Sequence, residues 1–140
     1  MVAQGQITGM RGVYLVAAEL ANLGFIASPT SRSAIGADIL VTDQSCSRAF
    51  SVQVKTNSRT FYSWLLSKKA AKINSSTHIY VFVNIKAING KDSIEYYVVP
   101  SRVVANNIRK VKRPNSTWYA FDLSKARKYK DKWSIFGKAG

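Results

Sequence analysis

The stretch "DILVTDQSCSRAFSVQVKT", residues 38–56, holds two short apolar segments separated by a polar turn. In its second half, apolar and polar residues alternate: Phe50, Val52 and Val54 against Ser51, Gln53 and Lys55. Successive side chains of a β-strand point to opposite faces of its sheet, so this alternation predicts a strand with one apolar and one polar face. The intervening turn predicts that residues 38–43 and 49–56 pair as a hairpin. The polar face is unusual, because it carries an amide and an ammonium group two residues apart.

The segments before this hairpin predict a helix, a strand and a loop. Residues 8–25 carry apolar side chains at helical spacing, with Thr8 as the predicted N-cap and Gly24 at the end of the helix. Residues 25–31 predict a short strand that Pro29 stops, and residues 31–38 predict a loop that contains Gly36.

The segments after the hairpin predict alternating helices and strands. Residues 61–73 are interpreted as an amphipathic helix with Phe61, Leu65 and Ile73 facing inward. Residues 78–86 are too apolar for a solvated face and predict a central strand, which an Asn-Gly turn connects to a strand at 94–100. The remaining residues predict a basic helix at 101–113, a strand at 117–123 and a basic tail at 124–133.

This order, α-β-β-β-α-β-β-α, predicts an α/β (α+β) fold with a mixed central β-sheet flanked by helices. At 140 residues, of which 46% are hydrophobic, the chain is expected to form a single domain over residues 1–140. No apolar segment approaches the ~18 residues that would span a bilayer, and the start of the chain lacks the pattern of a signal peptide. One cysteine, Cys46, excludes an internal disulfide. Together these observations lead us to expect a cytoplasmic protein with no membrane partner.

Positive charge is concentrated in one part of the chain. The net charge is +14, and residues 1–50 contribute three basic and three acidic side chains, so the whole excess lies in residues 51–140. Such an excess predicts a polyanionic partner, most simply nucleic acid. The residues predicted to contact DNA phosphates come from the two basic segments: Lys68, Lys69, Lys72, Arg109, Lys110, Lys112 and Arg113. An ordinary solvated helix face remains the alternative for the first three.

Three polar residues of the hairpin suit phosphodiester chemistry. Asp38 opens the first strand, and Gln53 and Lys55 lie on one face of the second, ~7 Å apart at about 3.4 Å per residue. A carboxylate and an amide oxygen are ligands for Mg²⁺ (or Mn²⁺), so Asp38 and Gln53 are candidate metal ligands. A lysine beside the metal can orient the attacking water or stabilise negative charge in the transition state. The alternatives are that Asp38 only caps a strand end and that Gln53 and Lys55 form an exposed sheet face.

The segments "GADILV" and "SVQVKT" resemble the PD-(D/E)XK nuclease superfamily, whose core has the order α-β-β-β-α-β. In this resemblance Asp38 matches the motif aspartate, Lys55 matches the lysine, and Gln53 replaces the usual acidic residue, as in some homing endonucleases. The first helix with "LGFIASPTS" is most similar to the Holliday-junction-resolvase-like branch, and the resemblance covers roughly residues 8–86. It implies a restriction-endonuclease-like core and a metal-dependent DNA endonuclease acting on double-stranded or branched DNA. Because two sites must meet two antiparallel strands, a homodimer or higher homo-oligomer is expected.

One position departs from this family pattern. Members of that branch carry a glutamate in the first helix, and the corresponding position here is Val13. Glu19 lies on the same helix but about 240° around it, at roughly 100° per residue. Three interpretations stay open: two ligands and Lys55 suffice, another acid such as Asp43 compensates, or the site is inactive. The second function hypothesis is therefore a catalytically degenerate nuclease fold that binds DNA or another protein.

Overall fold

A computed structural model describes residues 3–31, 36–59 and 61–140 of the chain. The helices are α1 (Gln4–Asn22), α2 (Ser101–Asn107) and α3 (Leu123–Ala126), with 3-10 turns η1 (Lys68–Ala71), η2 (Arg127–Tyr129) and η3 (Trp133–Phe136). The strands are β1 (Ile26–Pro29), β2 (Ile39–Thr42), β3 (Ala49–Asn57), β4 (Ser63–Leu66), β5 (His78–Ile88), β6 (Lys91–Pro100), β7 (Arg109–Arg113) and β8 (Ser116–Asp122). Of the predicted loop over residues 31–38, positions 32–35 lie outside the described residues.

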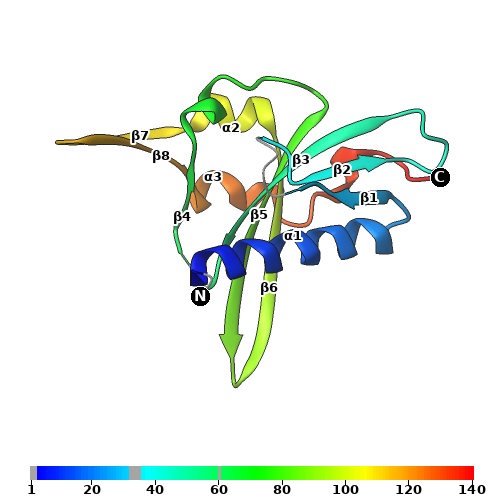
Figure 1. Ribbon diagram of the computed structural model, residues 1–140, viewed down its shortest axis with the longest axis horizontal. Helices are drawn as coiled ribbons and strands as arrows, with labels where there is room; N and C mark the ends of the chain where they lie inside the picture. The colour runs from blue at the N-terminus through cyan, green and yellow to red at the C-terminus, as the bar shows by residue number, and fades with distance from the viewer. Residues whose placement is uncertain (1–2, 32–35, 60) are drawn as a thin grey trace.

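In the described residues the strands form a larger sheet, ordered β1-β2-β3-β5-β6, and a smaller sheet, ordered β4-β8-β7. Strands β1, β2 and β3 pair antiparallel, β3 pairs parallel with β5, and β5 pairs antiparallel with β6. The mixed sheet flanked by helices confirms the predicted fold class (Figure 1). The hairpin of β2 and β3 also forms as predicted, with Ile39 opposite Val52.

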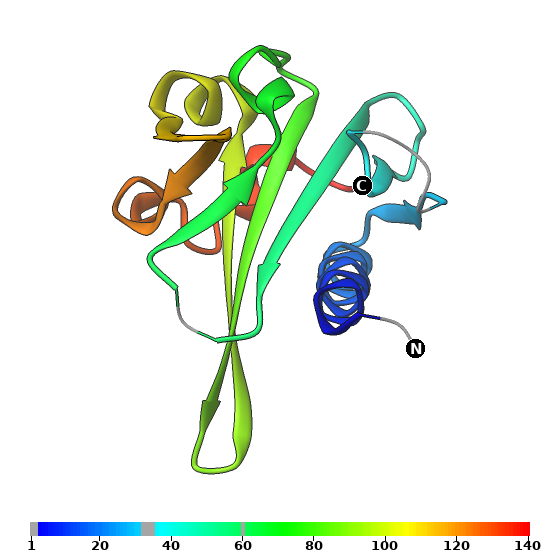
Figure 2. The same ribbon diagram turned by 60° about the vertical axis from the view of Figure 1, so that its left-hand side comes forward.

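Alternating side chains of β5 divide the core between the two faces of the larger sheet. Ile79, Val81 and Val83 pack with Val16 and Leu20 of α1, whereas Tyr80 and Phe82 pack against the smaller sheet. Figure 2 shows α1 on one side of the larger sheet and the smaller sheet with α2 and α3 on the other. Residues 78–85 of β5 are buried on both faces, which explains why this part of its sequence lacks alternation.

The connection between β3 and β5 differs from the prediction. The prediction of a helix over residues 61–73 is wrong, because this segment forms β4 and then the short turn η1. Trp64 and Leu66 are buried while Leu65 is exposed, so the burial period is two residues and not that of a helix. The indole Nε1–H of Trp64 donates a hydrogen bond to the Val83 carbonyl at 3.0 Å, which ties β4 to the larger sheet.

Two further boundaries differ from their predictions. The helix α2 ends at Asn107, and the basic residues 109–113 form strand β7 instead of continuing the predicted helix. The helix α1 begins at Gln4, so Thr8 lies inside it and is not its N-cap. The Asn-Gly turn is confirmed, since Asn89 and Gly90 have positive φ values of 51° and 76° at the end of the β5–β6 hairpin. Within the described residues, no helix has the length and apolar character needed to span a membrane.

A glycine brings α1 close to β3. A Cβ atom at Gly12 would overlap with Oγ1 of Thr56, so only glycine allows this approach. Gly9 lies nearly one turn earlier on the helix, and a Cβ there would meet no atom within 4 Å.

These two glycines give a matched pair of substitutions. We expect Gly12→Ala to lower the free energy of unfolding by about 1–3 kcal/mol through overpacking. Gly9→Ala should raise it by about 0.5–1 kcal/mol, because alanine has the higher helix propensity and the space is open. Chemical denaturation of the two variants and the parent chain measures both changes. Equal effects of the two substitutions would contradict the close contact of α1 with β3.

Candidate active site

A cavity of about 340 Å³ lies between the first half of α1 and the part of β3 that extends beyond β2. Its lining includes Asp38, Gln53, Lys55 and Thr56 from the sheet, and Gly9 and Val13 from α1. The fold therefore brings the three polar residues of the hairpin together in one concave place.

Asp38 is held rigidly at the start of β2. Its backbone N–H donates to the Val52 carbonyl at 2.8 Å, and its carbonyl accepts from the Thr30 N–H at 2.9 Å. Because β2 begins only at Ile39, the next N–H of β3, that of Val54, has no strand partner on this side, and it donates to Asp38 Oδ2 at 2.8 Å. The carboxylate thus caps a strand edge and also lines the cavity. The described residues supply no other side-chain hydrogen bond to it.

Gln53 and Lys55 are positioned by the centre of the sheet. They lie opposite Tyr80 and Phe82 in the parallel β3–β5 register, and both side chains are half-buried. Among the described residues, no hydrogen bond or ion pair engages either side chain, and both residues line the cavity. An exposed sheet face, the alternative interpretation, does not describe them, because they line a concavity next to Asp38.

Val13 lies on the α1 wall of this same cavity, half-buried, and also packs against the core between α1 and the sheet. Val13 therefore belongs in part to the core and in part to the wall of the cavity. The wall next to it is formed by Gly5 and Gly9, where an added Cβ would meet nothing within 4 Å. Sequence reasoning missed these two glycines. The sequence does contain one indication of this wall, because positions 5 and 9 share one face of the helix and both are glycine.

The two acids considered as substitutes for a glutamate at position 13 lie elsewhere. The Glu19 carboxylate is close to Tyr96, and burial together with this charge raises the pKa of that tyrosine to about 12. Asp43 belongs to the turn between β2 and β3, where it accepts hydrogen bonds from the Ser47 hydroxyl at 2.7 Å and the Ser47 N–H at 2.8 Å. These bonds, with those from Arg48, lower the pKa of Asp43 to about 2. Neither acid lines the cavity.

The donor atoms in the cavity fit a hard divalent cation that keeps much of its hydration. In residues 3–31, 36–59 and 61–140, no three His, Cys, Asp or Glu side chains gather into a metal cluster. Mg²⁺ does not need one, because it is commonly held by one or two carboxylates and by the phosphates of its substrate. Asp38 and Gln53 would supply one carboxylate and one amide oxygen. This set suits Mg²⁺ or Mn²⁺ better than Zn²⁺, which prefers histidine and cysteine.

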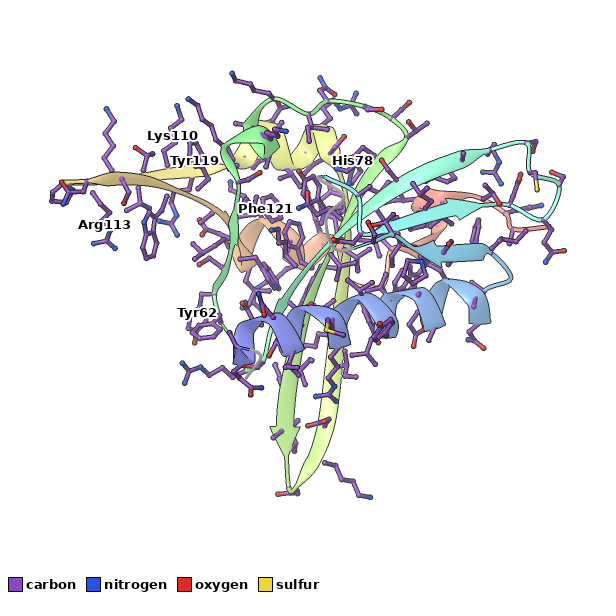
Figure 3. The ribbon with its side chains drawn as sticks, viewed as in Figure 1. Tyr62, His78, Lys110, Arg113, Tyr119 and Phe121 are labelled. Atoms are coloured by element: carbon purple, nitrogen blue, oxygen red, sulfur yellow. The ribbon has the colours of Figure 1, made fainter. Side chains whose placement is uncertain are left out.

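The basic residues predicted to contact DNA lie outside the cavity. Lys68, Lys69 and Lys72 are exposed on and after η1, which is not the helix expected there. The other four residues lie on the β7–β8 hairpin, where Figure 3 shows Lys110 and Arg113. Arg109 is paired with the Asp122 carboxylate at 2.9 Å, and this hydrogen bonding raises its pKa.

His78, the only histidine in the chain, lies at the start of β5 and is buried. Its Nδ1 lies 2.7 Å from the Ser51 hydroxyl, while its Nε2 has no partner in the described part of the chain. Burial lowers the pKa of His78, and the Asp38 carboxylate opposes this shift only in part. Burial therefore favours the neutral imidazole in the folded protein, and His78 is not among the residues that line the cavity.

The arrangement of the sheet, with α1 on one face and the polar residues at the free edge of β3, is similar to the fold of a Holliday junction resolvase. One solved structure that it resembles is Archaeoglobus fulgidus Hjc, a Holliday junction resolvase from an archaeal hyperthermophile. The TM-score is 0.55 at 14% sequence identity, over 85% of this chain and 87% of that chain. No protein-family model matches the chain, and the search of curated proteins also gave no match. The predicted restriction-endonuclease-like core is thus confirmed as a fold.

The neutral state of His78 predicts a pH dependence of stability. As the pH falls below the ordinary value of 6.5, the unfolded chain binds a proton that the folded chain resists, so the free energy of unfolding falls. We expect this loss between about pH 8 and about pH 5 to be smaller in His78→Gln, which has no proton to bind. Denaturation of both proteins at several pH values measures the difference. Parallel pH profiles would show that His78 is not held neutral.

Proposed function

We propose that this protein is a divalent-metal-dependent DNA endonuclease that hydrolyses phosphodiester bonds in double-stranded or branched DNA. The observation that carries this proposal is the convergence of Asp38, Gln53 and Lys55 in one open cavity of a resolvase-like fold. The chain's net charge of +14 supports a polyanionic substrate. A homodimer would place two such sites on the two strands of DNA.

Each residue has a role that follows from its position. Asp38 and Gln53 would hold Mg²⁺ or Mn²⁺, which supplies charge neutralisation at the scissile phosphate and lowers the pKa of water. Lys55, half-buried beside them, stabilises the extra negative charge that develops on the phosphate as the water attacks. The hydrogen bond from the Val54 N–H fixes Oδ2 of Asp38, so the carboxylate needs little reorganisation when the substrate binds. The side-chain-free wall at Gly5 and Gly9 leaves room for a DNA backbone to approach.

A second candidate function is DNA binding without cleavage. The observation that favours it is Val13, which lines the cavity at the place where the family resemblance expects a glutamate. A site with a single carboxylate holds a divalent cation weakly unless the substrate phosphate completes its coordination. The experiments below separate the two functions.

The endonuclease proposal predicts that Lys55→Ala lowers the rate of DNA cleavage by about 10²–10³-fold, the usual cost of removing one group that stabilises transition-state charge. Supercoiled, linear and four-way-junction DNA are the substrates, with Mg²⁺ or Mn²⁺. Lys91→Ala, at the far end of the β5–β6 hairpin, makes the same change in charge and should leave the rate unchanged. Asp38→Asn should lose cleavage but keep its stability, since an amide oxygen can still accept from the Val54 N–H. Unimpaired cleavage by Lys55→Ala would refute the assigned site.

Val13→Glu tests the missing carboxylate. In the absence of metal, the new carboxylate joins the charges of Asp38 and Lys55 in the cavity. The melting temperature of Val13→Glu should therefore be lower than that of Val13→Gln, which has the same shape without the charge. Mn²⁺ should then stabilise Val13→Glu more than it stabilises either Val13→Gln or the parent chain. If the parent chain does not cleave DNA and Val13→Glu does, the degenerate function is correct for the natural sequence. If Mn²⁺ stabilises the two variants equally, position 13 does not face the metal.

A further inference from the structure

The β7–β8 hairpin extends beyond the rest of the molecule as a two-stranded ribbon. β4 pairs only with residues 119–122 of β8, so residues 111–113 and 116–118 have no third strand beside them in the described structure. Figure 1 shows this part projecting away from the larger sheet. At about 3.4 Å per residue, the free part of the ribbon with its turn reaches roughly 10–14 Å beyond β4.

Both faces of this ribbon carry cations. In the antiparallel register Lys110 lies opposite Tyr119 and Lys112 opposite Thr117, which places both lysines on one face. Arg113 lies opposite Ser116 on the other face, next to Trp118. Figure 3 shows Lys110 and Arg113 on opposite sides of the ribbon, and all three cations are exposed. The sequence has no acidic residue between Glu95 and Asp122, so nothing within the free ribbon neutralises them.

The aromatic rings of the ribbon hold these cations in place. The Arg113 guanidinium lies 5.5 Å from the centre of the Trp118 ring, and the Lys110 ammonium lies 5.8 Å from that of Tyr119. The Trp118 Nε1–H also donates to the Ser116 hydroxyl at 3.1 Å across the turn. These ring contacts order the cations, and ordered cations are well placed for phosphates.

We propose that the β7–β8 ribbon inserts into the major groove of duplex DNA, with Lys110 and Lys112 facing the phosphates of one strand and Arg113 those of the other. The inference takes its partner, DNA, from the proposed function, but it concerns a surface separate from the cavity. The major groove is about 12 Å wide and about 8.5 Å deep and admits a two-stranded ribbon, whereas the minor groove is only about 6 Å wide. The free ribbon is therefore long enough to reach the floor of the major groove. Cations on both faces suit a groove with a phosphate wall on each side, since a ribbon lying flat on DNA would use one face only.

The first test measures the affinity for a short duplex by fluorescence anisotropy over a range of salt concentrations, without divalent cations. We expect Lys110→Ser/Lys112→Ser to weaken binding at least tenfold and to reduce the slope of log affinity against log salt by about 2. Arg113→Ser should reduce that slope by about 1. The control Lys91→Ser/Lys138→Ser also removes two exposed charges, one at the far end of the β5–β6 hairpin and one near the C-terminus, and should keep the parent slope. An effect confined to one face of the ribbon, or equal effects in the control, would overturn the proposal.

The second test identifies the groove. A duplex whose cytosines carry a bulky sugar at C5, which projects into the major groove, should bind the parent chain weakly, whereas netropsin in the minor groove should not compete. The opposite pattern would overturn the major-groove assignment. A third measurement compares the affinity of Trp118→Ala for single-stranded and for duplex DNA. If this variant loses single-strand binding and keeps duplex binding, the ribbon is a base-stacking surface and the proposal is wrong. None of these measurements requires cleavage, so they stand or fall independently of the endonuclease activity.

Discussion

The short β2 strand, beside a much longer β3, is the constraint on which the site depends. Their pairing ends at Ile39 and Val52, so the outer edge of β3 is open from Gln53 onward. An unpaired backbone N–H is costly when it is shielded from water, and the Val54 N–H finds its acceptor in the carboxylate of Asp38. The same interaction that completes the sheet therefore fixes a charged group at its edge. The parallel pairing of β3 with β5 supports Gln53 and Lys55 from the other side, so the cavity is framed by strands and not by flexible loops.

In the proposed enzyme the electrostatic character of the cavity is unusual. Gln53 stands in place of a second acid, and Val13 lies on the helix wall. Asp38 is therefore the single carboxylate among the described residues that line the cavity. Less negative charge lowers the affinity for free metal, but it also lowers the repulsion of an incoming phosphate. Metal and DNA would then bind together more strongly than either binds alone, because the phosphate supplies ligands that the protein lacks. The strongly basic second half of the chain offsets the weak attraction of the cavity itself.

Sequence patterns predicted the elements whose burial follows a simple period. The alternation in β3, the apolar run of β5 and the Asn-Gly turn all identified their structures correctly. The segment 61–73 misled because Trp64 and Leu66 are buried by a second sheet, whose strands come from far along the chain and leave no local signal. Strand β7 was predicted as part of a helix for another reason. Both faces of its ribbon are exposed to water, so the sequence "RKVKR" has no apolar period that indicates a strand. For the site, the sequence predicted Asp38, Gln53 and Lys55, which the fold brings to one cavity. It did not predict the glycine wall, whose only signal was that positions 5 and 9 share one face of the helix.

That glycine wall makes one side of the cavity the least stable part of the helix that forms it. Each glycine costs a helix about 1 kcal/mol relative to alanine, and Gly5 and Gly9 lie in its first two turns. The start of α1 has neither a side-chain cap at Ala3 nor an acidic residue in its first turn. Its firm attachment to β3 begins only at Gly12, where the backbone meets Thr56. The residues before Arg11, which pairs with Asp92 of β6, can therefore unwind at a lower cost than global unfolding, while the sheet and the carboxylate at its edge stay fixed. In the proposed enzyme this local opening would widen the entrance for duplex DNA.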